Sequence, residues 1–203
     1  MTKRVRTHTN PFTVRDRFDT LDYSQLQPNF SGKVDLEIGF GRGVFFRHWA
    51  KKHPDNLLLG VEVRKQIVDL LADKLIEDSI SNAKAFRGEG KIFLEEAIQD
   101  NSLDNVFIFH PDPWLKKRHH KRRLVNKDFL HLLTKKMKKE AKLYISTDVE
   151  SLWEAMLEGI EEEKSFVKAS DQGFWNSDYL SHWDNFSIED NRKRFFCTFI
   201  QKL

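Results

Sequence analysis

Short apolar runs and amphipathic stretches alternate through most of the chain. Runs of strand length occur at residues 34–38, 57–63, 83–86, 103–109 and 143–146, and each is expected to form a buried strand. Apolar residues recur with helical spacing at residues 44–53, 67–76, 92–98, 129–137 and 150–163. Strands that alternate with helices predict a parallel sheet with helices packed on both of its faces.

The two ends of the chain depart from this alternation. Residues 1–30 are polar and show no clear period, so they are predicted to form a flexible basic N-terminal arm. Residues 166–169 and 195–200 look like two strands with no helix between them, which predicts an antiparallel edge. The expected architecture is one α/β domain over residues 31–203, with a mostly parallel seven-stranded sheet and an antiparallel C-terminal edge.

Composition narrows the classes of function. With 203 residues the chain has the length of a single domain with a full core. Its formal net charge is only +3, so basic residues matter through clustering. The single cysteine, Cys197, excludes an internal disulfide and a cysteine-rich zinc site. No stretch approaches ~20 apolar residues and the N-terminus lacks an apolar signal segment. We therefore expect a cytoplasmic protein, monomeric or homodimeric, with no membrane or metal partner.

The first apolar run ends in a glycine-rich turn. The pattern Glu37-x-Gly39-x-Gly41-x-Gly43 leads directly into a helical segment, and glycines there let the backbone turn tightly and approach a ligand. A dinucleotide fingerprint needs a glycine at position 44, which is Val44. Glu37 is also awkward beside a pyrophosphate, whereas it suits a ligand with a cationic group. A plain strand-to-helix turn is the alternative reading of the glycines.

Two further acids follow predicted strands. Glu62 ends the second run, ~20 residues after the glycine turn, which is the spacing at which a carboxylate accepts hydrogen bonds from ribose hydroxyls. Glu89 follows the third run and is able to accept from an adenine amino group. Strand-end acids that merely face water are the alternative for both residues.

Residues 110–123 carry the strongest functional signal. Asp112 stands between two prolines and beside Trp114, directly after the run 103–109, so it is expected at the sheet edge where open α/β folds bind ligands. Six Lys or Arg residues and two histidines follow within eight positions, which favours docking to phosphates. A solvated basic loop is the alternative, but such a loop needs neither the prolines nor the tryptophan.

Together these motifs resemble the tRNA (guanine-N7)-methyltransferase family, of the bacterial single-chain type. The resemblance covers residues 34–150 and includes the block Pro111-Asp112-Pro113-Trp114 with its basic continuation, followed by Thr147-Asp148. It implies a Rossmann-like class I methyltransferase domain, with S-adenosylmethionine as the cofactor and tRNA as the partner. The implied reaction is methylation of N7 of a guanine in the variable loop (position 46).

The resemblance also implies a role for individual residues. Catalysis or positioning of the base falls to Asp112. The resemblance implies cofactor contacts at Glu37, Glu62 and Glu89 and substrate contacts at Lys116 and Asp148. From the residues themselves, Gly39, Gly41, Gly43 and Asp112 are further candidate cofactor contacts. Further candidate substrate contacts are Trp114, Lys117, Arg118, Lys121, Arg122, Arg123, Ser181 and Asp184. The basic residues among them are expected to bind phosphates, which position a substrate without specifying its sequence.

The chain departs from the family in two places. Leu115 stands where the family usually has proline, so the loop after Trp114 is expected to be less rigid. The family's Thr-Lys-Phe-Glu block is absent, and Ser181-His182-Trp183-Asp184 offers a comparable hydroxyl, base, aromatic ring and acid in the corresponding region. Trp114 is expected either to stack on the base or to pack under its loop. His119 and His120 are interpreted as RNA-facing or solvated, because adjacent histidines without acidic or cysteine ligands rarely form a metal site.

Three other functions stay open on the sequence alone. The Asp112-Pro113-Trp114 loop is also similar to the D-P-P-[YFW] loop of amino-methyltransferases, which modify adenine, cytosine or glutamine nitrogens. A non-catalytic RNA-binding module with a degenerate cofactor fold is a second alternative, and the intact glycines, Glu37 and Asp112 argue against it. A nicotinamide dehydrogenase is disfavoured by Val44.

Overall fold

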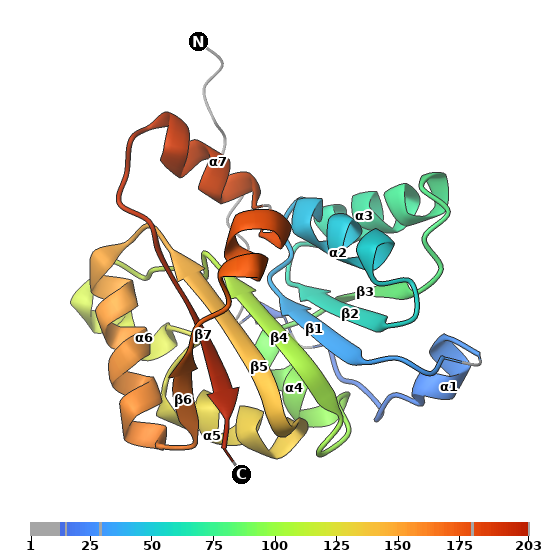
Figure 1. Ribbon diagram of the computed structural model, residues 1–203, viewed down its shortest axis with the longest axis horizontal. Helices are drawn as coiled ribbons and strands as arrows, with labels where there is room; N and C mark the ends of the chain where they lie inside the picture. The colour runs from blue at the N-terminus through green and yellow to red at the C-terminus, as the bar shows by residue number, and fades with distance from the viewer. Residues whose placement is uncertain (1–12, 15, 29, 180, 203) are drawn as a thin grey trace.

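The computed structural model describes residues 13–14, 16–28, 30–179 and 181–202. A seven-stranded sheet in the order β3-β2-β1-β4-β5-β7-β6 forms its centre (Figure 1). Its strands are β1 (Val34–Ile38), β2 (Leu57–Glu62), β3 (Ala83–Arg87), β4 (Leu103–Phe109), β5 (Met137–Thr147), β6 (Phe166–Ala169) and β7 (Phe195–Gln201). β1 to β5 pair in parallel, and β7 runs antiparallel between β5 and β6. The expected mostly parallel sheet with an antiparallel edge is confirmed.

Helices cover both faces of this sheet (Figure 1). One face carries α2 (Val44–Lys52), α3 (Lys65–Glu77) and the π-helical turn η3 (Phe174–Asp178). The other face carries α4 (Gly90–Glu96), α5 (Lys127–Lys136) and α6 (Glu150–Glu163). The described chain also contains α1 (Tyr23–Leu26), the 3₁₀ helix η2 (Lys117–Arg122) and α7 (His182–Glu189).

The central strands are apolar on both sides because both faces of the sheet are covered. In β4, Val106 and Ile108 belong to the core cluster under α4, α5 and α6, whereas Phe107 and Phe109 belong to the cluster under α2 and η3. This alternation follows from the period of two along a strand. The buried strands form a rigid layer, and the segments that leave their carboxyl ends are held at one edge of it.

The segment 16–28 packs against the domain, unlike the free arm expected over residues 1–30. Phe18 donates its backbone N–H to Glu96 Oε2 at 3.0 Å, and Leu21 donates to the carbonyl of Ala97 at 2.8 Å. The Tyr23 ring is buried. Because the segment wraps around α4 irregularly, its anchor residues follow no helical or strand period. Residues 1–12 lie outside the described part of the chain.

The expectation of no helix between β6 and β7 is wrong. The turn η3 and helix α7 both lie in this connection, and α7 stands beside the sheet edge at the top of Figure 1. The buried residues of α7 are Asp184 and Ser187, so its inward face is polar and leaves no hydrophobic period in the sequence. In η3 the buried residues Phe174 and Trp175 are adjacent, which does not match α-helical spacing.

Candidate functional site at the carboxyl edge of the sheet

Predicted site residues gather where the parallel strands end. Five acids lie at or just after the ends of five strands in chain order: Glu37 near the end of β1, Glu62 at the end of β2, Glu89 after β3, Asp112 after β4 and Asp148 after β5. The strand order reverses between β1 and β4. Open α/β sheets bind ligands in the crevice at such a reversal, outside the carboxyl ends of the strands.

The glycine turn adopts a backbone that other residues rarely take. Gly39, Gly41 and Gly43 have φ angles of 80°, 52° and 67°, all in the left-handed region that glycine tolerates. A Cβ atom at Gly43 would lie 2.5 Å from Leu71 of α3, so the turn needs glycine in order to pack there. A Cβ at Gly39 would meet no atom within 4 Å. The turn therefore packs tightly against α3 at Gly43, whereas Gly39 borders empty space that a ligand could enter.

Glu37 is a buried carboxylate with an unsatisfied oxygen. Its residue is 4% exposed, and among the described residues its Oε2 atom has no hydrogen-bond partner. Burial, and next the charge of Glu62, raise the pKa of Glu37 well above its usual value. A charged group in such a position is costly unless something pairs with it. The site thus favours a ligand that brings a cationic hydrogen-bond donor to Glu37.

Glu62 is as buried as Glu37 but fully hydrogen-bonded. Arg64 donates its Nε to Oε1 at 3.0 Å and its Nη2 to Oε2 at 2.9 Å. The backbone N–H groups of Arg64 and Gly41 complete the set at 3.1 and 3.2 Å. These bonds to Glu62, with the charge of Asp112 as a smaller cause, raise the pKa of Arg64. Arg64 was not predicted from the sequence; it pairs with Glu62 and also lies within the electrostatic influence of Asp112.

Glu89 is the N-cap of α4. Its Oε2 accepts a hydrogen bond from the backbone N–H of Ile92 at 2.9 Å, which satisfies one of the open donors at the helix start. The capping bond fixes the direction of the carboxyl group at the sheet edge. A contact with an adenine amino group stays a prediction for this residue.

The loop that carries Asp112 has an unusual backbone at each end. His110 and Trp114 have φ angles of 47° and 42°, in the left-handed region that is uncommon for residues other than glycine. Asp112 between them is exposed. The guanidinium carbon of Arg122 lies 5.1 Å from the centre of the Trp114 ring, and the His119 ring meets it edge-on at 5.7 Å. Trp114 therefore packs against the basic segment η2.

Arg123 lies in a different position from the other basic residues of the run. It is 5% exposed and donates Nε to the carbonyl of Pro113 at 3.0 Å and Nη1 to the carbonyl of Ser151 at 2.8 Å. It therefore anchors the Asp112 loop to the start of α6, and its donors are used inside the protein, which disfavours the phosphate contact expected for Arg123. The exposed cations of the run are Lys116, Lys117, Arg118 and Lys121.

Arg123→Met is expected to lower the melting temperature, whereas Arg118→Met is expected to leave it unchanged. Loss of the guanidinium removes its hydrogen bonds to the carbonyls of Pro113 and Ser151, which together contribute about 1–3 kcal/mol, and a domain of this size loses roughly 2–4 °C per kcal/mol. Thermal unfolding followed by circular dichroism checks the difference, which we expect at roughly 3–8 °C. Equal melting temperatures for the two variants would contradict the anchoring role.

The predicted substrate residues near the C-terminus are engaged in internal contacts. Asp148 Oδ2 accepts from Arg192 Nη1 at 2.9 Å. Ser181 caps α7, where its Oγ accepts from the backbone N–H of Asp184 at 3.4 Å. Asp184 in turn accepts from Arg194 Nη1 at 2.8 Å. Because Ser181 and Asp184 are both buried, they hold α7 in place, and the structure does not present them on a surface that faces substrate.

Comparison with known proteins assigns the chain to a family. The family described as "Putative methyltransferase" matches residues 31–194. The tRNA (guanine-N(7)-)-methyltransferase of Shewanella baltica is 38% identical over 160 residues, which cover 75% of this chain and 67% of that protein. The chain belongs to the tRNA (guanine-N7)-methyltransferase family. A member from Paraburkholderia xenovorans is 41% identical over 136 residues, which cover 67% of this chain and 52% of that protein. The match thus spans about half to two thirds of the length of these relatives.

Solved structures agree with the fold of this family member. The 16S rRNA methyltransferase KamB superposes with a TM-score of 0.67 at 13% identity, covering 92% of this chain and 96% of that chain. The aminoglycoside resistance methyltransferase NpmB1 gives a TM-score of 0.57 at 14% identity, covering 90% and 94%. At such low identity these likenesses show the class I methyltransferase fold alone.

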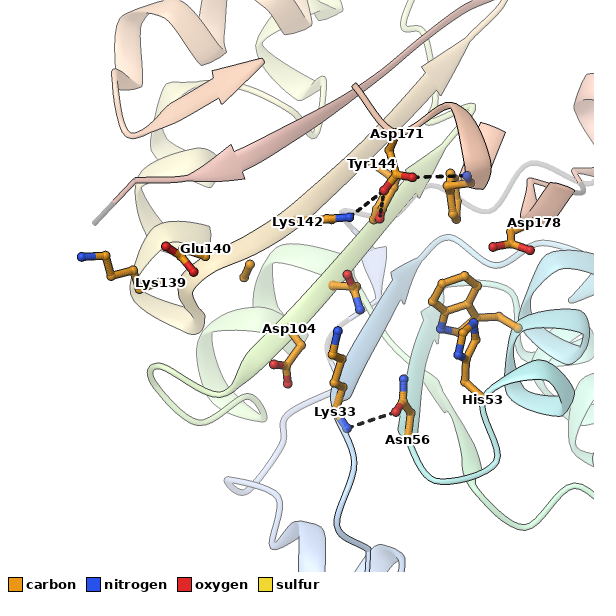
Figure 2. A pocket seen from close by; sticks show the side chains of 14 residues that line it. Lys33, His53, Asn56, Asp104, Lys139, Glu140, Lys142, Tyr144, Asp171 and Asp178 are labelled. Carbon is orange, nitrogen blue, oxygen red and sulfur yellow. Dashed lines mark hydrogen bonds and ion pairs between the residues drawn. The ribbon is translucent and has the colours of Figure 1, made fainter. Parts of the chain in front are cut away.

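A hollow of about 500 Å³ extends from the amino ends of β1, β4 and β5 over the sheet face that α2 and η3 cover (Figure 2). Lys33 precedes β1 there, and Asp104 and Lys139 lie near the starts of β4 and β5. Several of its charged groups are paired within the protein: Asp171 contacts Lys142 at 2.7 Å and Tyr144 at 2.9 Å, and Asp104 pairs with Lys138 at 2.7 Å. This hollow therefore offers no reactive group comparable to Asp112.

The described residues contain neither a metal-binding cluster nor a membrane-spanning helix. No group of three or more His, Cys, Asp or Glu side chains there has the arrangement of a metal site. No described helix has the length and apolar character needed to cross a membrane.

Proposed function

We propose that this protein transfers a methyl group from S-adenosylmethionine to N7 of a guanine in tRNA, in the variable loop. One observation carries the proposal: the buried Glu37, whose Oε2 has no hydrogen-bond partner among the described residues, shares a sheet edge with the exposed Asp112, whose loop continues directly into exposed cations. The names of the relatives agree with this chemistry, since they are tRNA (guanine-N(7)-)-methyltransferases.

The residues at the carboxyl edge fit S-adenosylmethionine. This cofactor supplies an electrophilic methyl group on a sulfonium, and it carries an ammonium group and a nucleoside. Glu37 Oε2, which lacks a partner among the described residues, would accept from the ammonium group. Gly39 leaves space for a close backbone approach. Glu62 would accept from the ribose hydroxyls, sharing its oxygens with Arg64, and Glu89 would lie near the adenine.

Guanine N7 needs no catalytic base, because it carries an in-plane lone pair and no proton. The protein's task is therefore to orient the base and to stabilise charge. The carboxylate of Asp112 would accept from the guanine N1–H and from the exocyclic amine. Adenine lacks this donor pair, so the contact selects guanine, and the carboxylate also offsets the positive charge that forms on the ring.

The cationic surface beside Asp112 fits the phosphates of a folded RNA. Lys116, Lys117, Arg118 and Lys121 are exposed along η2 and its cap, and phosphate contacts of this kind position the substrate. Recognition of the Watson–Crick edge by Asp112 requires a guanine that is unpaired or displaced from its stack.

Methyl transfer from labelled cofactor to bulk tRNA tests the proposal, followed by borohydride reduction and aniline cleavage at 7-methylguanine. Cleavage at one site in the variable loop is the expected result. Label without aniline-sensitive sites would place the methyl group on another atom and contradict N7 as the acceptor. Absence of label while the cofactor binds would contradict tRNA as the substrate.

Lys117→Gln combined with Lys121→Gln is expected to weaken tRNA binding and to flatten its dependence on salt. Each phosphate contact contributes about 0.7–0.9 to the slope of log affinity against log salt, so the slope should fall by about 1.5. Filter binding across a salt series measures it. Lys164→Gln with Lys202→Gln is a matched control, because these exposed lysines flank β6 and β7 at the opposite edge. If the two double variants showed equal changes in salt slope, the cations beside Asp112 would not form a specific docking surface for tRNA.

A further inference from the structure

His110 occupies a strained position between β4 and the Asp112 loop. Its φ angle is 47°, and a non-glycine residue in this region is strained and persists only where the surrounding structure holds it there. Its backbone N–H still donates to the carbonyl of Ser146 in β5 at 2.8 Å, so the left-handed turn begins directly at the end of the sheet. Asp112 follows two residues later.

The ring of His110 is buried between two partners from other segments. Its side chain is 6% exposed. The Nε2 atom lies 3.0 Å from the Tyr179 hydroxyl. Nδ1 lies 3.5 Å from Asp148 Oδ1, a close charge contact in which Nδ1 forms no hydrogen bond among the described residues. The imidazole of His110, followed by Arg192, holds the pKa of Asp148 well below its usual range, so Asp148 presents a charged acceptor to this ring.

Both partners are themselves fixed. The Tyr179 hydroxyl also lies 2.8 Å from Ser146 Oγ, and its ring packs edge-on against Phe109 at 5.0 Å. Burial raises the pKa of Tyr179, so the hydroxyl keeps its proton and is able to donate. Arg192 holds the other oxygen of Asp148 from the connection between α7 and β7. The His110 ring thus joins the ends of β4 and β5 to the segment 174–194.

We propose that His110 is a positioning residue for Asp112, and that its contact with Tyr179 couples the Asp112 loop to the segment 174–194. The proposal rests on the proposed function. A single residue, Pro111, separates His110 from Asp112, so a change in the backbone turn at His110 moves the carboxylate of Asp112 directly. A misplacement of about 1 Å at a reacting centre costs about 100-fold in rate. The segment 174–194 would therefore act on turnover without touching the substrate.

A double-mutant cycle tests this coupling, with His110→Asn and Tyr179→Phe as its two changes. Asparagine tolerates the left-handed backbone but lacks the ring that bridges Asp148 and Tyr179, whereas phenylalanine removes only the hydroxyl. We expect kcat at saturating tRNA and cofactor to fall about 10- to 100-fold in His110→Asn and about 3- to 10-fold in Tyr179→Phe. The double variant should be no slower than His110→Asn, because coupled residues are non-additive. KM for tRNA and Kd for the cofactor should each change by less than about threefold.

His131→Asn is the matched control, because His131 Nδ1 lies 3.5 Å from Glu163 Oε1, the same type of contact on α5 and α6. Its kcat should equal that of the wild type. Wild-type kcat in His110→Asn, or effects of the two changes that simply multiply, would overturn the proposal. Hydrogen exchange over residues 111–116 gives a second readout that does not need catalysis. Faster exchange is expected in both variants, and unchanged exchange would overturn the positioning role even if the wild type proved not to methylate tRNA.

Discussion

Asp112→Asn is expected to lower kcat for tRNA methylation by about 100- to 1000-fold, the usual effect of removing one group that stabilises charge in a transition state. The amide keeps the size of the carboxylate, but its NH2 group meets the guanine exocyclic amine as a second donor, and its charge is lost. Asp112 is exposed on its loop, whereas the buried acid with the open oxygen is Glu37. The Kd for S-adenosylmethionine should therefore change by less than about threefold.

Single-turnover methyl transfer and calorimetric titration of the cofactor measure the two quantities separately. Asp55→Asn is a suitable control, because Asp55 is an exposed acid in the turn before β2, at the opposite edge of the sheet. Turnover close to that of the wild type in Asp112→Asn would sink the role proposed for this residue. A parallel loss of cofactor affinity would move Asp112 from the base to the cofactor.

Glu37→Gln is expected to weaken cofactor binding by about 10- to 100-fold and, in the same variant, to raise the melting temperature of the cofactor-free protein at pH 8. A charge-assisted hydrogen bond contributes about 1.5–3 kcal/mol, and each 1.4 kcal/mol is tenfold in Kd. The gain in stability has a separate cause, which is that the buried Glu37 carboxylate lacks a partner for Oε2 among the described residues.

The dependence of stability on pH follows from the ionisation of Glu37. The pKa of Glu37 is raised in the folded protein, so the folded state holds this proton more tightly than the unfolded state. Stability is then lost as pH rises from the unfolded value of about 4.3 through the folded pKa. The melting temperatures of the wild type and Glu37→Gln should therefore differ at pH 8, and this difference should disappear below about pH 4.

Glu62→Gln provides the contrast. Glu62 is 5% exposed, close to the 4% of Glu37, but Arg64 and two backbone groups satisfy its oxygens. This substitution should lower the melting temperature at pH 8, because it removes the charge that pairs with Arg64. If Glu37→Gln were destabilised in the same way, Glu37 would have a partner in the cofactor-free protein.

The sequence predicted the parts of the molecule that obey a simple period. The buried runs 34–38 and 103–109 became β1 and β4 with the expected bounds, because strands covered on both faces are apolar throughout. The glycine turn and Asp112 lie at the predicted edge because parallel strands bring their carboxyl ends together. Arg64, two residues beyond Glu62, was missed because single charges after a strand are common.

The failures have a common physical origin in polar groups that are satisfied inside the protein. Arg123 is indistinguishable in sequence from the exposed cations before it, and its burial depends on the carbonyls of Pro113 and Ser151, which are supplied by the fold. Helix α7 buries Asp184 and Ser187, so its pattern predicts no helix. His110 was visible beside the prolines, but its two partners come from positions 148 and 179, and local sequence carries no record of such contacts.

The place of β7 in the sheet sets an order for folding on the ribosome. β7 pairs with β5 on one side and with β6 on the other, yet it is synthesised after both. Until residues 195–201 emerge, β5 and β6 each present an open edge, and exposed edges invite pairing with other chains. Arg192 precedes β7 by three positions and donates a hydrogen bond to Asp148. The insertion of β7 between β5 and β6 and the assembly of the contacts around His110 are therefore expected to occur together, as a late step in the folding of each newly synthesised chain that depends on long-range contacts.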